Sequence, residues 1–163
     1  MADPAVPQGI EVRLARDDEL EQVVRLRWRW SSERGTPVVA ESDHVAAAAA
    51  WAREHRDTHL PHIALDDGGV VVGMAWLALT PRVPGVGQLQ RTSGDLQSCY
   101  VVPERRGAGI GGALTRAVLA TALERGAEHV TVHASPSSVR MYARHGFAHS
   151  DRLLWAEAAI AEA

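Results

Sequence analysis

The 163-residue chain has a net charge of −3, and 46% of its residues are hydrophobic, which is typical of one globular domain. All 17 basic residues are arginine, so chemistry that requires a lysine, such as a Walker phosphate loop or a Schiff base, is excluded. The slightly acidic balance offers no broad electrostatic surface for nucleic acid, and no nucleic-acid partner is expected.

Hydrophobic periodicity and turn residues predict ten elements. Their order is β-α-α-β-β-β-α-β-α-β, over residues 10–15, 17–35, 42–58, 62–65, 70–79, 95–102, 109–124, 130–134, 137–145 and 147–156. Helices follow several of the strands, while the middle strands form meanders. The pattern therefore predicts an α/β fold with a mixed sheet.

The ends of the chain and its single cysteine bear on domain organisation and location. Residues 1–9 are expected to form a flexible leader, and residues 10–163 a single domain. The first residues lack a basic segment followed by an apolar stretch, so they do not form a secretory signal. The run from Val70 to Leu79 is too short to span a bilayer, and Cys99 has no partner for an internal disulfide. A cytoplasmic protein without membrane contact is expected.

A glycine-rich turn joins the strand at 95–102 to the helix at 109–124. Four glycines occur within six residues: Gly107, Gly109, Gly111 and Gly112. Glycines allow backbone N–H groups to approach an anion closely, and a helix N-terminus adds partial positive charge. The spacing also matches a dinucleotide-binding turn, but that motif requires an acidic residue at the end of the next strand. Here the strand at 130–134 ends at Ser135, which argues against a nicotinamide cofactor.

Two segments resemble signatures of one enzyme family. The run from Val101 to Leu114 resembles the Pro-x-x-Arg-Gly-x-Gly-Ile-Gly-x-x-Leu signature of the Gcn5-related N-acetyltransferases (GNAT), and Arg106, Gly109 and Gly111 fit its shorter R/Q-x-x-G-x-G core. The segment from Tyr142 to Phe147 resembles the Tyr-x-x-x-Gly-Phe signature that follows it. The resemblance covers residues 10–150 in element order.

The resemblance implies a GNAT-like fold in which acetyl-coenzyme A (acetyl-CoA) lies between two splayed parallel strands, here 95–102 and 130–134. The backbone of Cys99 and Val101 would pair with the pantetheine arm, and the amide of Val101 would polarise the thioester carbonyl. The pyrophosphate would be held by the glycine turn. The expected acetyl-CoA-binding residues are Cys99, Val101, Arg106, Gly107, Ala108, Gly109, Ile110, Gly111, Gly112 and Ser135. Ser135 takes the place of an asparagine that is frequent in the family.

The resemblance also implies direct transfer of the acetyl group to an amine, which needs an acid and a base. Tyr142 matches the family's tyrosine acid, since a phenol is protonated at neutral pH. Asp95 is the first candidate for the base, because alternation along a strand would place Asp95, Cys99 and Val101 on one face. His133, on the opposing strand, is a second candidate.

Two further groups of residues have alternative interpretations. His55, His59 and His62 with Asp57 could ligate a metal only if one helix carried them, and Pro61 interrupts that helix, so no metal site is expected. Arginines at 25, 27 and 29 alternate with Leu26, Trp28 and Trp30. They could face an acidic ligand, but an ordinary surface or dimer face is also typical of this pattern.

The sequence therefore predicts an acetyl-CoA-dependent N-acetyltransferase that acts on a primary amine of a small molecule or peptide. A non-catalytic acyl-CoA-binding sensor is the alternative. Homodimers are common in the resembling family, so a homodimer is a further expectation. The residues do not specify the acceptor.

Overall fold

The computed structural model describes residues 6–35, 39–156 and 158. Its elements are β1 (Ile10–Leu14), η1 (Asp17–Glu19), α1 (Leu20–Glu33), α2 (Glu41–Glu54), β2 (His59–Asp66), β3 (Val71–Pro81), β4 (Thr92–Val101), η2 (Pro103–Arg105), α3 (Ile110–Glu124), β5 (Ala127–Val132) and α4 (Val139–Arg144). Residues 1–5 of the expected leader lie outside the described residues. Where the expected leader meets β1, the N–H of Ile10 donates a hydrogen bond to the carbonyl of Pro7.

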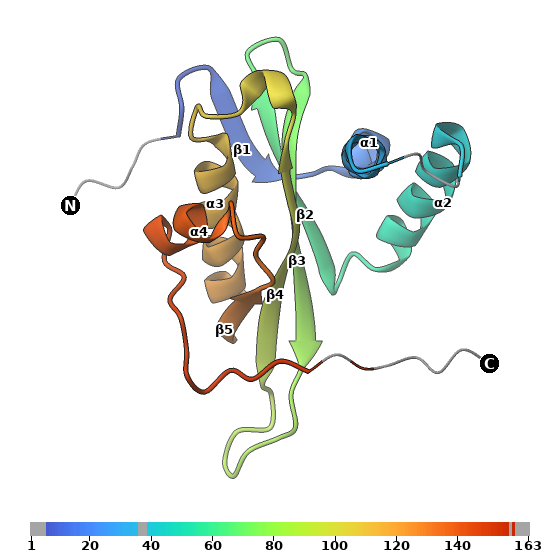
Figure 1. Ribbon diagram of the computed structural model, residues 1–163. Coiled ribbons are helices and arrows are strands. Elements are labelled where there is room, and N and C mark those ends of the chain that lie inside the picture. The colour runs from blue at the N-terminus through green and yellow to red at the C-terminus, as the bar shows by residue number, and fades with distance from the viewer. Residues whose placement is uncertain (1–5, 36–38, 157, 159–163) are drawn as a thin grey trace.

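The five strands form one sheet in the order β1-β2-β3-β4-β5. Neighbouring strands are antiparallel except for β4 and β5, which are parallel. Helices α3 and α4 cover one face of the sheet, and α1 and α2 lie on the other (Figure 1). These faces are called the α3 face and the α1 face below. The predicted mixed α/β fold is confirmed.

The core lies on both sides of β3, which explains the composition of that strand. Residues 71–78 of β3 are all buried, because helices pack on both faces of the sheet at this point. A strand covered on both faces has a continuous apolar sequence instead of an alternating one. Within the described part of the chain, no helix is both long and apolar enough to cross a membrane.

The strand predicted over residues 147–156 is wrong: this segment contains no strand. A turn interrupts it, in which the N–H of Arg152 donates to the Ser150 hydroxyl and the N–H of Leu153 donates to the Ser150 carbonyl. The outer edge of β5 is therefore not paired by this segment, and Leu154 and Trp155 are largely exposed. A strand needs a partner strand in register, and this segment pairs with none of the five strands of the sheet.

A buried histidine connects β2 to α3. His62 is 1% exposed, and its ring lies 2.8 Å from the Thr121 hydroxyl and 3.2 Å from the Leu60 carbonyl oxygen. Burial lowers the pKa of His62 to about 4. The histidine is therefore neutral in the folded protein at neutral pH, and it packs in the core instead of ligating a metal.

We expect acid to destabilise the protein through His62. The unfolded chain binds this proton below a pKa of about 6.5, whereas the folded chain binds it only below about 4. The stabilisation is complete above pH 6.5 and is lost as the pH falls to 4, by about 3 kcal/mol in total. Urea unfolding at pH 7 and pH 4.5 measures this loss. In His62→Gln the loss should be smaller by roughly 2–3 kcal/mol, and equal losses in both proteins would contradict the assignment.

Candidate active site

The two parallel strands, β4 and the edge strand β5, separate part-way along β4. β4 and β5 pair from Thr92 opposite Ala127 to Leu96 opposite Val132. Beyond Leu96, β4 continues to Val101 while β5 ends. An opening between the two strands therefore begins next to Gln97, where the sequence analysis expects the cofactor.

A β-bulge lies in β4 at this opening. Tyr100 pairs with Met74, and Gln97 pairs with Trp76. Between these two pairs β4 has one more residue than β3. Within the bulge, Ser98 has a φ of 57°, a left-handed conformation that is uncommon for a residue other than glycine. Because of the extra residue, each side chain after the bulge points to the face opposite to the one that simple alternation along β4 would predict.

The bulge overturns the prediction that Asp95, Cys99 and Val101 share one face. Val101 pairs with Gly73, and a Cβ on Gly73 would meet Leu114 and Ile110 of α3. Val101 and, by alternation, Cys99 therefore face α3. Asp95 pairs with Ala78, and Tyr100 pairs with Met74, which alternation places on the opposite, α1 face. Asp95 and Cys99 therefore lie on opposite faces of the sheet.

Tyr142 of α4 lies beside Cys99 on the α3 face. The tyrosine is 7% exposed, and its ring packs edge-on against Phe147 at a centroid distance of 5.4 Å. Burial and the neighbouring Cys99 raise the pKa of Tyr142 above its usual value. Burial likewise raises the pKa of the Cys99 thiol to about 11. Both groups are protonated at neutral pH, so the hydroxyl is available as a proton donor and the thiol is a poor nucleophile.

The backbone of Val101 offers one donor at the opening. The N–H of Val102 donates to the Val72 carbonyl of β3 at 3.0 Å. Successive N–H groups of a strand point to opposite sides, so the N–H of Val101 points away from β3. The Val101 carbonyl accepts a hydrogen bond from Arg106 Nε at 2.8 Å.

The turn after β4 presents backbone donors. Gly107 and Gly109 have φ values of 78° and 84°, which disfavour any residue with a side chain. Gly109 is the N-cap of α3, the first turn of α3 holds no acidic residue, and no side chain caps it. The N–H groups of Ile110, Gly111 and Gly112 precede the first intrahelical bond, which runs from Ala113 to Gly109. This arrangement can hold an anionic group.

Three of the expected binding residues have additional roles. The Arg106 side chain bonds Val101 and Glu33 instead of extending over the glycine turn. Gly112 lies against α4, since a Cβ there would be 2.2 Å from His145 Nε2. The Ser135 hydroxyl lies 2.9 Å from that of Ser138 at the start of α4.

The two candidate bases have different surroundings. The Asp95 carboxylate accepts hydrogen bonds from the Thr131 hydroxyl at 2.8 Å and the Gln97 amide at 3.0 Å. These bonds fix Asp95 on the α1 face, four residues before Cys99. His133 follows β5, and its ring meets Trp155 edge-on at 6.0 Å.

A short hydrogen bond joins β4 to α1 on the α1 face. The Tyr100 hydroxyl donates to Glu33 at 2.5 Å, and Arg106 donates to the other oxygen of Glu33 at 2.9 Å. These two donors lower the pKa of Glu33. Burial, followed by the Glu33 carboxylate, raises the pKa of Tyr100 to about 12. No sequence pattern indicates this pair, because its members are 67 positions apart.

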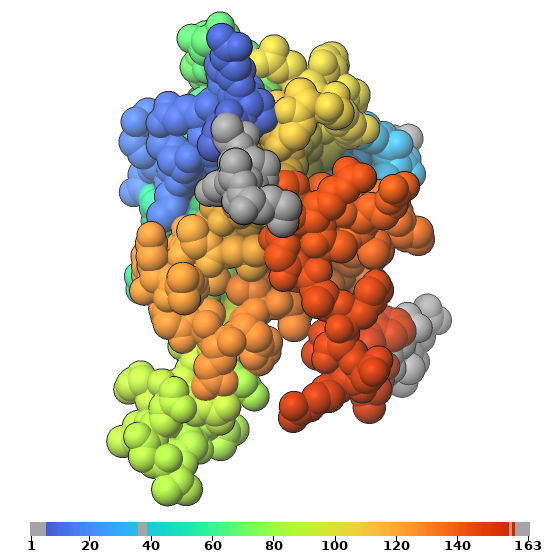
Figure 2. Space-filling view, turned by 90° about the vertical axis from the view of Figure 1, so that its left-hand side faces the viewer, coloured from blue at the N-terminus to red at the C-terminus, as the bar shows by residue number. Residues whose placement is uncertain are grey.

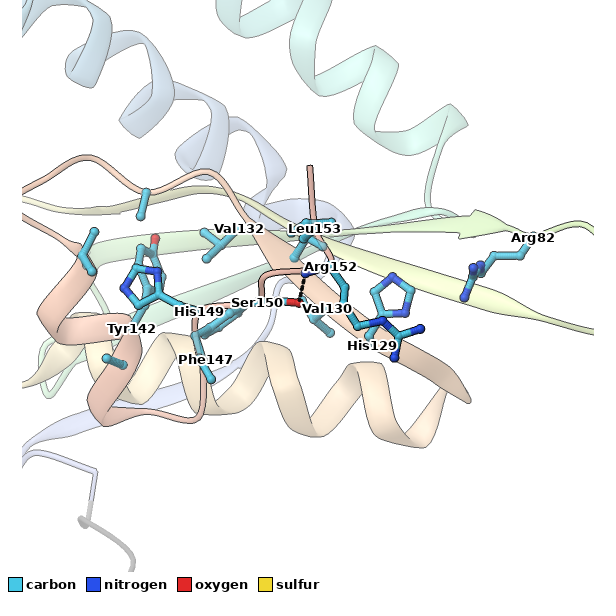
Figure 3. Close-up of a pocket in the computed structure, with 15 residues that line it drawn as sticks. Arg82, His129, Val130, Val132, Tyr142, Phe147, His149, Ser150, Arg152 and Leu153 are labelled. Carbon is cyan, nitrogen blue, oxygen red and sulfur yellow. Dashed lines mark hydrogen bonds between the residues drawn. The ribbon is translucent and has the colours of Figure 1, made fainter. Parts of the chain in front are cut away.

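A cavity of about 630 Å³ lies between β5, α4 and residues 147–153. Val132 and Tyr142 line its inner wall, and Phe147 and Leu153 belong to the segment across it (Figure 3). The cavity therefore adjoins the opening from the side of β5. In the space-filling view, α4 and the C-terminal segment form the right-hand part of this face beside α3, and the turn between β3 and β4 projects at the bottom (Figure 2).

The splayed strands, the uncapped helix and the adjacent tyrosine agree with a comparison of the sequence with protein families. The model of the acetyltransferase (GNAT) family matches residues 17–147, which is most of the chain. The chain belongs to the GNAT family. The resemblance found in the two signature segments is thus confirmed, and the protein is a member of a family of acetyltransferases.

Solved structures show the same GNAT fold. An acetyltransferase from Trypanosoma brucei is 23% identical, with a TM-score of 0.69 over 91% of this chain and 99% of that one. A protein from Clostridium acetobutylicum described as a predicted acetyltransferase, solved with acetyl-CoA, is 18% identical, with a TM-score of 0.71 over 91% of this chain and 96% of that one. A GCN5-related N-acetyltransferase from Ralstonia eutropha JMP134 is 25% identical, with a TM-score of 0.68 over 91% and 99%. No curated protein matches the sequence.

The three histidines near Pro61 do not converge on one site in this GNAT protein, although the rings of His55 and His59 meet edge-on at 5.9 Å. The ring of His55 stacks on Trp51 at 4.1 Å and His59 meets Trp51 edge-on at 4.8 Å, whereas His62 points toward α3. Among the residues described, no three His, Cys, Asp or Glu side chains are grouped as metal ligands would be.

Proposed function

We propose that the protein transfers the acetyl group of acetyl-CoA directly to a primary amine of a small molecule or peptide. The main support is the opening between β4 and β5, which lies next to the uncapped N-terminus of α3 and to Tyr142. The opening offers an extended ligand the free strand edge of β4. The amides after Gly109 suit its pyrophosphate.

The two sides of the opening suggest a division of the chemistry. Acetyl-CoA supplies the acetyl group as a thioester. The Val101 N–H donates a hydrogen bond to the thioester carbonyl oxygen as negative charge develops there. The amine approaches from the α1 face, where Asp95 accepts a proton from it directly or through water. On the α3 face, Tyr142 donates its proton to the departing sulfur.

The alternative is a sensor that binds acyl-CoA without catalysis. The buried, protonated hydroxyl of Tyr142 favours the enzyme, because a sensor has no need of a proton donor beside the thioester. Cys99 is not proposed as a covalent nucleophile, since burial raises the pKa of its thiol to about 11.

Thermal unfolding with acetyl-CoA, CoA and NAD in parallel tests the donor site. At about 100 times its dissociation constant, a ligand adds roughly 2.7 kcal/mol, so we expect Tm to rise by about 5–10 °C with both CoA species and not with NAD. Release of free CoA thiol is then measured over a panel of amines. Absence of any shift would refute the donor site. A shift without acetylation of any amine would favour the sensor.

A further inference from the structure

The sheet-facing side of α1 changes from apolar to basic along the helix. Leu20, Val23 and Val24 are buried against the core. Positions three or four residues apart lie on the same side of a helix. On this side, Val24 is followed by Arg27, Trp30 and Arg34. We call these three residues the basic stripe; Arg34 is the C-cap of α1.

The basic stripe lies over the end of β4 on the α1 face. The Trp30 ring stacks with Tyr100 at a centroid distance of 6.0 Å. Tyr100 is the residue between Cys99 and Val101, which border the proposed site of acetyl transfer. The stripe is therefore next to the path that the amine would follow.

The two arginines of the basic stripe share one aromatic ring. The guanidinium carbons of Arg27 and Arg34 lie 4.7 and 4.8 Å from the centre of the Trp30 ring. Such cation–π contacts orient a guanidinium but do not neutralise its charge. Loss of solvent, followed by the charge of Arg34, lowers the pKa of Arg27. The charge of Arg34 thus disfavours the charge of Arg27.

Neighbouring arginines have carboxylate partners. Arg25 pairs with Glu41 at 2.9 Å, Arg29 with Glu104 at 2.7 Å and Arg106 with Glu33 at 2.9 Å. Within residues 6–35, 39–156 and 158, neither arginine of the basic stripe has a carboxylate at ion-pair distance. The acidic groups near the stripe are therefore already engaged, and two positive charges remain beside the proposed amine path.

We infer that the basic stripe binds an anionic group of the acceptor, so that the substrate is an amine that also carries a carboxylate. A planar guanidinium matches a carboxylate with two parallel hydrogen bonds. The ligand would neutralise the repulsion between Arg27 and Arg34. This inference rests on the proposed function and specifies its substrate class.

Matched substrates test the inference. Glycine, β-alanine, 4-aminobutyrate and 6-aminohexanoate are compared with their carboxamides, and the series of lengths measures the distance from the amine to the stripe. We expect kcat/KM to favour the best acid over its amide by about 10- to 100-fold. Arg27→Gln and Arg34→Gln should remove most of this preference by slowing the acid and not the amide. Arg25→Gln, on the same helix, is the matched control and should retain the preference. Aminoalkylphosphonates show whether a phosphoryl group replaces the carboxylate.

A binding measurement separates failure of this inference from failure of the proposed function. The same acids are titrated in the presence of CoA, and tryptophan fluorescence is recorded, with Trp30→Phe identifying the signal of Trp30. Saturable binding of acids that is lost in Arg27→Gln supports the stripe even if no amine is acetylated. Equal rates for acids and amides, or an acid preference that survives both arginine variants, would overturn the inference. A change of oligomeric state in the variants without a change in preference would likewise overturn it and assign the stripe to an interface between copies.

Discussion

Tyr142→Phe is expected to lower kcat by about 10²- to 10⁴-fold, which is the usual contribution of a positioned general acid. The variant removes only the hydroxyl beside Cys99, so the thiolate would have to leave without a proton. The ring remains to pack against Phe147. Steady-state release of CoA thiol, with the best amine found in the panel, measures the effect.

The affinity of Tyr142→Phe for acetyl-CoA separates the loss of acid catalysis from the loss of the site. The dissociation constant should change little, because the proposed binding contacts are backbone groups of β4 and the glycine turn. A variant that keeps the full rate would show that another group protonates the sulfur. A variant that no longer binds acetyl-CoA would give Tyr142 a structural role instead.

Gly109→Ala is expected to weaken acetyl-CoA binding by about tenfold. Gly109 has a φ of 84°, and an alanine in this left-handed conformation costs roughly 1–2 kcal/mol. The turn escapes this strain by changing conformation, which misaligns the N–H groups at the start of α3. Acetyl-CoA can bind only when these N–H groups are aligned again, so binding must restore the strained conformation. The affinity therefore falls by about the free energy of the strain. Calorimetric titration with acetyl-CoA measures the change.

Gly87→Ala is the matched control for this variant. Gly87 has a φ of 76°, so an alanine there has backbone strain similar to that of Gly109→Ala. An added Cβ would meet no atom within 4 Å other than those of the adjacent residues. It lies in the turn between β3 and β4, away from α3. Both variants should unfold at a somewhat lower temperature, but Gly87→Ala should keep the affinity of the wild type. Equal affinities in the two variants would mean that the glycine turn does not bind the pyrophosphate.

The sequence by itself determined the features that depend on neighbouring residues. Apolar periodicity predicted each helix and the first five strands within a few residues, because it reflects which side of an element is buried. The glycines at 107, 109, 111 and 112 indicated a turn whose backbone can approach an anion closely, because a glycine has no side chain to block its N–H group. The two signature segments were sufficient to predict the family.

Only the tertiary structure decided which side chains share a face. Alternation placed Asp95 and Cys99 together, but the bulge at Ser98 separates them, and nothing local to β4 predicts an unpaired residue there. The strand expected over residues 147–156 failed for a related reason. A strand requires a partner in register, and a turn at Ser150 interrupts this segment.

Contacts between distant elements were also beyond the sequence. The arginines and tryptophans of α1 could either face an acidic ligand or form an ordinary surface or dimer face. Stacking of Trp30 on Tyr100 placed them beside the opening in the sheet. Likewise, Gly112 belonged to a binding motif, whereas its contact with His145 shows that it also allows α4 to approach α3. Such contacts depend on how the elements pack, because residues that are far apart in the chain meet only when the sheet and its two helical layers assemble.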